Sequence, residues 1–339
     1  MKGFSFPKAV VYKEWRQLRG WLMLLAAVFW FAPVKTVVRY WTNVHAHPDQ
    51  QQFLAASVVQ MLQGLQPHFA AVTSTTLAAL VLGVVPMSLE RARGGLLLTL
   101  AAPVRRQDLV RVQAVLCLAA VWVALLLLTP YLLAVNAAFG HVVTTGDIAG
   151  WFLMQGLLKS AAFMVGFAVT TSVGNVIGAF ACALGLAGFP VYVSMMIQEL
   201  AHTAIHPEAF DEVVWRVAHD VMAMSPAVGP GVSDAPLWCL GGWYAVWAIG
   251  WYIAAEALFR RLPLEREGAL FAFPALWDVL FAGVGLMVGT VCGEMAVGGM
   301  EFDPRRTPVL TAVWLPVAAL TWFVLHAVRR WWIRRLRSA

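Results

Sequence analysis

Long apolar runs, separated by short polar segments, dominate the hydrophobic pattern of this chain. A helix needs roughly 20 apolar residues to cross a bilayer core of about 30 Å. Runs of about that length lie at 20–38, 69–89, 112–139, 151–171, 176–198, 238–258, 278–298 and 308–328. They lack the short alternating segments of a β-barrel. The pattern predicts an all-α, polytopic integral membrane protein with about eight transmembrane helices.

Two connections between these runs have predictable structure. Only residues 170–175 separate the fourth and fifth runs, which predicts a tight polar turn. The segment 199–237 is the longest external connection, and its apolar residues recur at helical spacing between Phe210 and Val221. We expect an amphipathic helix there, lying on the outer membrane surface or folded against the bundle. Ser225-Pro226 and Gly229-Pro230-Gly231 end it.

Composition narrows the class of protein. Hydrophobic residues make up 60% of the 339 residues and charged residues only 12%, about half the share in soluble domains. Mean hydropathy is +0.72. These values exclude a soluble globular domain, a disordered chain, a coiled coil and a collagen-like rod. Each of the four cysteines sits in an apolar stretch and none forms a CxxC, which indicates reduced, buried side chains.

The distribution of basic residues predicts the orientation. With a cytoplasmic N-terminus, 18 of the 24 Lys and Arg lie in inside segments, 5 lie outside, and Lys159 lies within a run. Cytoplasmic segments carry such an excess, so we expect an even number of spans and both termini in the cytoplasm. The net charge of +6 then reflects topology and contact with anionic lipid rather than nucleic-acid binding.

No catalytic motif is present. The chain has no GxxxxGK[ST], no HExxH and no GxSxG, so we expect no enzymatic activity by the chain alone. Glu199, His202 and His206 stand at i, i+3 and i+7, where they share one helix face and could ligate a metal. A solvated helix with incidental histidines explains them as well, and we predict no metal site.

Four ionisable residues fall inside apolar runs, where charges are costly and usually paired or functional. Glu256 can pair with Arg260 one turn later, and Glu294 and His326 lie near span ends. Lys159 lies about a third of the way into its run. Its ammonium either lines an internal cavity or extends to the outer interface, and both readings stay open.

Two stretches carry a resemblance to a known family. Residues 7–19 form an amphipathic lead into the first run, with an adjacent Lys13-Glu14 pair. The loop after the second run shows, in order, Glu90-Arg91, Gly94-Gly95, Leu96-Leu97-Leu98, Leu100, Pro103 and Arg105-Arg106. This order resembles the coupling loop of ABC-2 type (type-2 exporter-like) ABC transporter permeases, and 7–19 resembles their interfacial elbow helix.

The resemblance implies a domain organisation. It suggests a cytoplasmic or interfacial elbow helix over 1–19 and a six-helix transmembrane core over 20–262, with the external segment 199–237 inside it. Residues 263–328 would add two membrane helices, and 329–339 would form a basic cytoplasmic tail. Many family members stop after six spans, so the added pair leaves the subfamily and the substrate open.

The resemblance also implies a function. The chain would be the transmembrane subunit of an ATP-driven exporter in a bacterial-type plasma (inner) membrane. Its partners would be two copies of a P-loop ATPase, a second permease, identical or related, and lipid. ATP and Mg would bind to the ATPase, with no cofactor on this chain. Two alternatives remain: a membrane sensor or resistance protein that binds an antimicrobial compound without transport, and an intramembrane lipid-modifying enzyme.

Family positions carry over to particular residues. A substrate path between two permeases would include intramembrane polar or helix-distorting residues, namely Lys159, Gly185, Pro190 and Glu294. Gly185, Gly188 and Pro190 would make their span a site of kinking or close helix approach. The interface that couples the chain to the ATPase would comprise Lys13, Glu14, Arg16, Glu90, Arg91, Arg93, Gly94, Leu96, Leu97 and Pro103.

Overall fold

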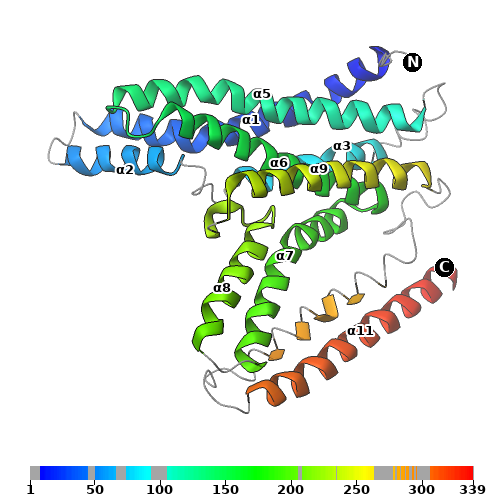
Figure 1. Ribbon diagram of the computed structural model, residues 1–339. Coiled ribbons are helices and arrows are strands. Elements are labelled where there is room, and N and C mark those ends of the chain that lie inside the picture. The colour runs from blue at the N-terminus through cyan, green and yellow to red at the C-terminus, as the bar shows by residue number, and fades with distance from the viewer. Residues whose placement is uncertain are drawn as a thin grey trace. The chain divides into compact units, whose positions relative to one another are not determined.

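The described part of the chain is built from helices (Figure 1). The computed structural model describes residues 8–44, 50–65, 74–92, 105–204, 208–233, 235–262, parts of 278–295, and 306–338. No β-strand occurs among these residues. The helices are α1 (Lys8–Val44), α2 (Gln51–Gln63), α3 (Ser74–Ala92), α5 (Arg106–Ala138), α6 (Thr145–Ser172), α7 (Val176–Ala204), α8 (Glu208–Ala223), α9 (Leu237–Arg260) and α11 (Arg306–Ser338).

Five of the described helices are long and apolar enough to cross a membrane: α1, α5, α6, α7 and α11. The class of polytopic helical membrane protein is therefore supported. Helices α3 and α9 coincide with two further predicted spans, 69–89 and 238–258. The predicted span 278–298 is described only in part, so the total of eight stays a prediction.

Helix α1 is continuous through the boundary predicted between the elbow helix and the first span. It runs for 37 residues and includes Pro33. At 1.5 Å per residue it is about 56 Å long, well beyond a hydrocarbon core of about 30 Å. Residues 8–19 therefore continue the predicted span 20–38 as one helix, and within 8–44 no break sets them apart as an elbow helix.

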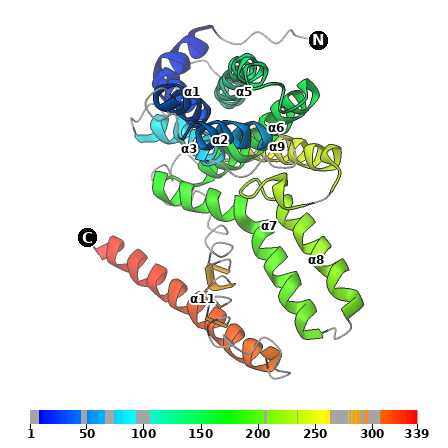
Figure 2. The same ribbon diagram turned by 90° about the vertical axis from the view of Figure 1, so that its left-hand side faces the viewer.

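The chain divides into two compact units, Met1–Ser194 with Arg216–Ala272, and Met195–Trp215 with Phe273–Ala339. In the first unit, α6 is the most deeply buried of the span-length helices and packs against α3, α5 and α9. Helix α1 packs on α2, α3 and α5, and Figure 2 shows α2 beside α1. Residues that hold the first unit together thus come from helices far apart in the sequence.

Glycines allow α3 and α6 to touch at the backbone. A Cβ on Gly83 would stand 2.1 Å from the carbonyl oxygen of Phe163, and a Cβ on Gly166 would stand 2.4 Å from that of Leu80. No larger residue fits at either position without moving a helix. Small residues at a crossing permit this approach in membrane bundles.

The local structure predicted for the two connections, a short turn and a helix, is found. A short turn, 173–175, joins α6 to α7, and the Asn175 side chain accepts hydrogen bonds from the backbone N–H groups of Ile177 and Gly178. Helix α8 occupies the predicted amphipathic segment and ends before Ser225. Helix α2 was not predicted, although Leu54, Val58 and Leu62 recur every four residues and are buried.

In the second unit, described residues between 278 and 289 pack on α11. A Cβ on Gly285 would stand 2.8 Å from the carbonyl oxygen of Ala318. Asp278 lies 3.4 Å from His326 and 3.3 Å from Arg329, so both basic groups face one carboxylate. Helix α11 continues to Ser338, so the predicted basic tail 329–339 is helical over its described residues.

Candidate functional site

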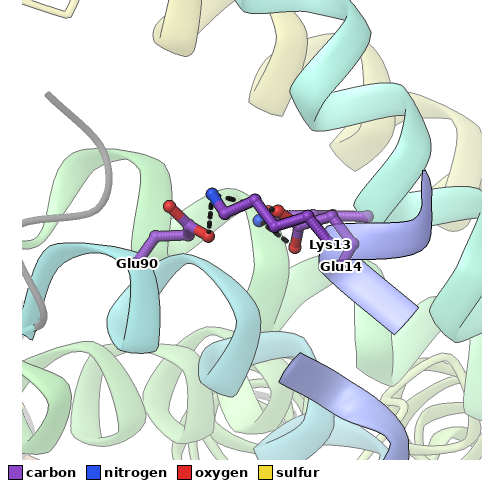
Figure 3. A network of polar contacts seen from close by, with 4 residues as sticks. Lys13, Glu14 and Glu90 are labelled. Atoms are coloured by element: carbon purple, nitrogen blue, oxygen red, sulfur yellow. Dashed lines mark hydrogen bonds and ion pairs between the residues drawn. The ribbon is translucent and has the colours of Figure 1, made fainter. Parts of the chain in front are cut away.

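A polar network joins the starts of α1 and α5 to the end of α3. The Lys13 ammonium donates a hydrogen bond of 2.7 Å to Glu90 Oε1 and lies 3.7 Å from Glu14 Oε1 (Figure 3). Gln113 Nε2 donates a 2.9 Å hydrogen bond to Glu14 Oε2. The Lys13 ammonium therefore contacts the carboxylates of Glu90 and Glu14, and the Gln113 amide is hydrogen bonded to the other oxygen of Glu14.

The carboxylates of this network are inside the protein. Glu14 and Gln113 are fully buried, and Glu90 is 1% exposed, whereas Lys13 is about 40% exposed. Removing one partner of a buried ion pair leaves an uncompensated charge and costs several kcal/mol. The network is therefore a firm connection between α1, α3 and α5.

Burial raises the pKa of Glu14 to about 7. The hydrogen bond from Gln113 opposes this shift, the Glu90 carboxylate adds to it, and Lys13 lowers the pKa again. Glu14 precedes the predicted span 20–38. Its carboxyl is therefore protonated more readily than a carboxyl in water.

Arg91, the neighbour of Glu90, holds the end of α6. Its Nη1 donates to the carbonyl oxygens of Thr170 at 2.5 Å and Val173 at 2.6 Å, and its Nη2 donates to that of Thr171 at 3.0 Å. The last carbonyls of a helix lack partners within it and carry partial negative charge. The guanidinium of Arg91 supplies both hydrogen-bond donors and a positive charge to these carbonyls.

Two residues of the predicted coupling interface have partners within the chain. Glu90 contacts Lys13, and Arg91 contacts the end of α6, while their role in coupling stays a prediction. Arg16 is exposed, with its guanidinium 5.9 Å from the centre of the Tyr12 ring, and remains accessible. Five predicted coupling residues lie outside the described residues: Arg93, Gly94, Leu96, Leu97 and Pro103.

A second polar cluster ties α5 to α9. The predicted pair between Glu256 and Arg260 forms, at 2.6 Å, and Arg111 also reaches Glu256 Oε1 at 2.9 Å. Sequence reasoning missed Arg111 here and Gln113 in the first network. Gln113 had a visible signal, since it is a polar residue inside the apolar run 112–139.

Lys159 is enclosed in the bundle. Its side chain is 2% exposed, its ammonium is hydrogen bonded to Gln155, and it lies 5.3 Å from the centre of the Phe29 ring. The alternative in which this ammonium extends to the outer interface is therefore wrong for this structure. An amide and an aromatic face are its described partners.

Among the described residues, the remaining substrate-path candidates form no common site. No described atom lies within 4 Å of a Cβ placed on Gly185 or Gly188, so these glycines make no close helix approach with the described residues. Pro190 lies inside α7. Glu294 lies outside the described residues.

The metal candidates likewise form no described site. Glu199 and His202 belong to α7, and His206 lies outside the described residues. Within the described part of the chain, no group of three potential metal ligands occurs.

Compared with known proteins, the chain matches no family model, no curated protein and no solved structure. What the chain can do is therefore argued from the networks themselves. The first network and Arg91 together fix the last turn of α3 to α1, α5 and α6. A force applied to the loop that follows α3 would reach several helices through these bonds.

Proposed function

We propose that this chain is the transmembrane subunit of an ATP-driven ABC transporter of the ABC-2 type, acting as an exporter. It would pair with a second permease and with two copies of a separate P-loop ATPase. The observation that best supports this is the Lys13–Glu90 bond, which joins the start of the first span to the residue that opens the coupling-type loop. The order of residues along that loop provides the resemblance to the family.

The proposed mechanism follows the bonds at the start of this loop. ATP binding by the partner would displace the loop 93–104. Glu90 would transmit that displacement to α1 through Lys13, and Arg91 would transmit it to the end of α6. Buried, charge-assisted bonds are short and strongly oriented, so neighbouring residues would move two helices together. The exposed Arg16 would offer a further charge to the ATPase.

The partner provides the first test. The tagged chain is purified from its native membranes in a mild detergent, and the proteins that come with it are identified by mass spectrometry. We expect a stoichiometric P-loop ATPase, and a second membrane chain if the transporter is a heterodimer. A chain that purifies alone, with no ATPase activity in any fraction, would contradict the proposal and favour a sensor or an enzyme.

The coupling step is tested by removing the bond between α1 and α3. Lys13→Gln should lower ATP-dependent transport at least tenfold while the complex stays assembled and hydrolyses ATP. Lys35→Gln, on the exposed opposite end of α1, is the matched control and should transport normally. The exchange Lys13→Glu with Glu90→Lys should restore part of the rate, because it rebuilds the pair. Normal transport by Lys13→Gln would exclude the coupling role.

A further inference from the structure

Arginines gather where α5 begins and α9 ends. One carboxylate oxygen, Glu256 Oε1, accepts from Arg111 Nη2 at 2.9 Å and from Arg260 Nη2 at 2.6 Å. Arg106 Nη1 donates to the carbonyl oxygen of Leu262 at 3.1 Å. The two helix ends are therefore held side by side through guanidinium groups.

Two more arginines flank this contact. Arg105 directly precedes Arg106, and Arg261 directly precedes Leu262, so each is the chain neighbour of one partner in the Arg106–Leu262 bond. Both side chains are exposed, and neither forms an ion pair with a described residue. Their charges face the surroundings of the protein.

The cluster carries excess positive charge. Among the described residues, its arginines are 105, 106, 111, 260 and 261, and the neighbouring carboxylates are Glu256 and Asp108, in the first turn of α5. Five cations face two anions, and Glu256 is already shared by two guanidiniums. Like charges held this close repel one another, and an added anion would lower that repulsion. Arginine suits phosphate oxygens, because its planar fork donates two parallel hydrogen bonds.

Apolar side chains continue from the cluster along both helices. Val115 stands one turn after Arg111 on the same face of α5 and is 51% exposed. Ile253 stands two turns before Arg260 on the same face of α9 and is 60% exposed. A ligand with a phosphate and apolar chains would meet complementary groups at both its parts, whereas a free phosphate would meet only the arginines.

We propose that the arginine cluster at the start of α5 and the end of α9 binds the phosphate headgroup of an anionic phospholipid, whose acyl chains lie along Val115 and Ile253. Arg105 and Arg261 contact the phosphate, and Arg106, Arg111 and Arg260 hold the two helix ends in place for it. The site needs no transport activity and is independent of the proposed exporter function.

The test uses the full chain in nanodiscs of phosphatidylcholine with increasing phosphatidylglycerol. Retained lipid is counted by native mass spectrometry, and thermal unfolding is followed in parallel. The double variant Arg105→Gln/Arg261→Gln is compared with Lys35→Gln/Arg39→Gln, which removes the same charge from exposed positions at the far end of α1. Because each basic residue near an anionic surface contributes about 1 kcal/mol, we expect the first variant to bind phosphatidylglycerol about 30-fold more weakly.

The control should keep the affinity within about threefold, and both variants should unfold at the wild-type temperature in pure phosphatidylcholine. An equal loss in both variants would show general charge attraction and overturn the site. Equal protection by inorganic phosphate in pure phosphatidylcholine discs would overturn the lipid as ligand. Unchanged affinity in Arg105→Gln/Arg261→Gln would overturn the proposal altogether.

Discussion

At the residue scale, Arg91 illustrates how one side chain can end one helix and complete another. It stands in the last turn of α3, and its guanidinium satisfies three carbonyls at the end of α6. Those carbonyls would otherwise be buried or partly buried without partners, which is costly. Arg91 therefore fixes the position of α3 relative to α6 as well as the end of α6 itself.

Arg91→Ala should lower the free energy of unfolding by about 2–4 kcal/mol, because charged hydrogen bonds are lost and carbonyls are left unpaired. Arg91→Lys should recover only part of this loss, since an ammonium cannot fork between two carbonyls. Thermal unfolding in detergent measures both. The exposed Arg39→Ala is the control and should change stability by less than about 0.5 kcal/mol. Equal effects of Arg91→Ala and Arg39→Ala would contradict the assigned contact.

Glu14 makes the stability of the folded chain depend on pH. Its pKa is about 7 in the folded chain, against an ordinary value of 4.5. Between these values the folded state keeps a proton that the unfolded chain releases. The stabilising contribution is therefore fully present below pH 4.5 and is lost as the pH rises through about 7.

The melting temperature of the wild type should fall between pH 5 and pH 8 by more than that of Glu14→Gln, which has no titrating group at this position. Gln at position 14 can still accept the hydrogen bond from Gln113, so the variant should fold. Differential scanning fluorimetry across this range gives both slopes. Parallel slopes would show that Glu14 does not titrate in the folded protein.

At the scale of elements, the crossing of α3 and α6 depends on hydrogen atoms at Gly83 and Gly166. The atoms closest to an added Cβ are backbone carbonyl oxygens, which cannot rotate away as a flexible side chain can. Thr170 Oγ1 of α6 also lies 3.5 Å from the carbonyl oxygen of Gly83. A methyl group here would have to push the two helices apart.

Gly83→Ala and Gly166→Ala should each lower the free energy of unfolding by about 1–3 kcal/mol, the usual cost of overpacking. Gly185→Ala, at a helical position with nothing within 4 Å, should be neutral or stabilise by up to about 1 kcal/mol. The fraction of monodisperse protein after heating, measured by size-exclusion chromatography, ranks the three. A Gly83→Ala variant as stable as Gly185→Ala would contradict the backbone contact.

Contacts that are local in sequence could be predicted, and those between distant helices could not. Hydrophobic periodicity located α5, α6, α7 and α8, and the spacing of Glu256 and Arg260 gave their pair. Lys13 and Glu90 are 77 residues apart, so no local pattern reveals that they meet. Burial of Glu90 depends on how three helices pack. An exposed partner surface was expected where a buried bond is found.

At the scale of the whole molecule, the number of membrane crossings decides on which side the termini lie. The five helices that meet the length and composition criteria would place the two termini on opposite sides. The predicted eight spans, which add α3, α9 and 278–298, would place both on the same side. The arginines at the end of α11 favour the second arrangement, because basic residues stay on the cytoplasmic side.

Reporter fusions in a bacterial host distinguish the two arrangements. Green fluorescent protein fused after residue 338 should fluoresce, and alkaline phosphatase at the same point should be inactive, because each reporter works on one side only. The same reporters placed after His141, in the turn between α5 and α6, should give the opposite result, since that turn follows the third predicted span. An active phosphatase at residue 338 would mean an odd number of crossings, and at least one of α3, α9 and 278–298 would then not cross the bilayer. Replacing Arg329, Arg330, Arg334, Arg335 and Arg337 with Gln should shift part of the chain to that odd topology if these charges hold the end of α11 in the cytoplasm.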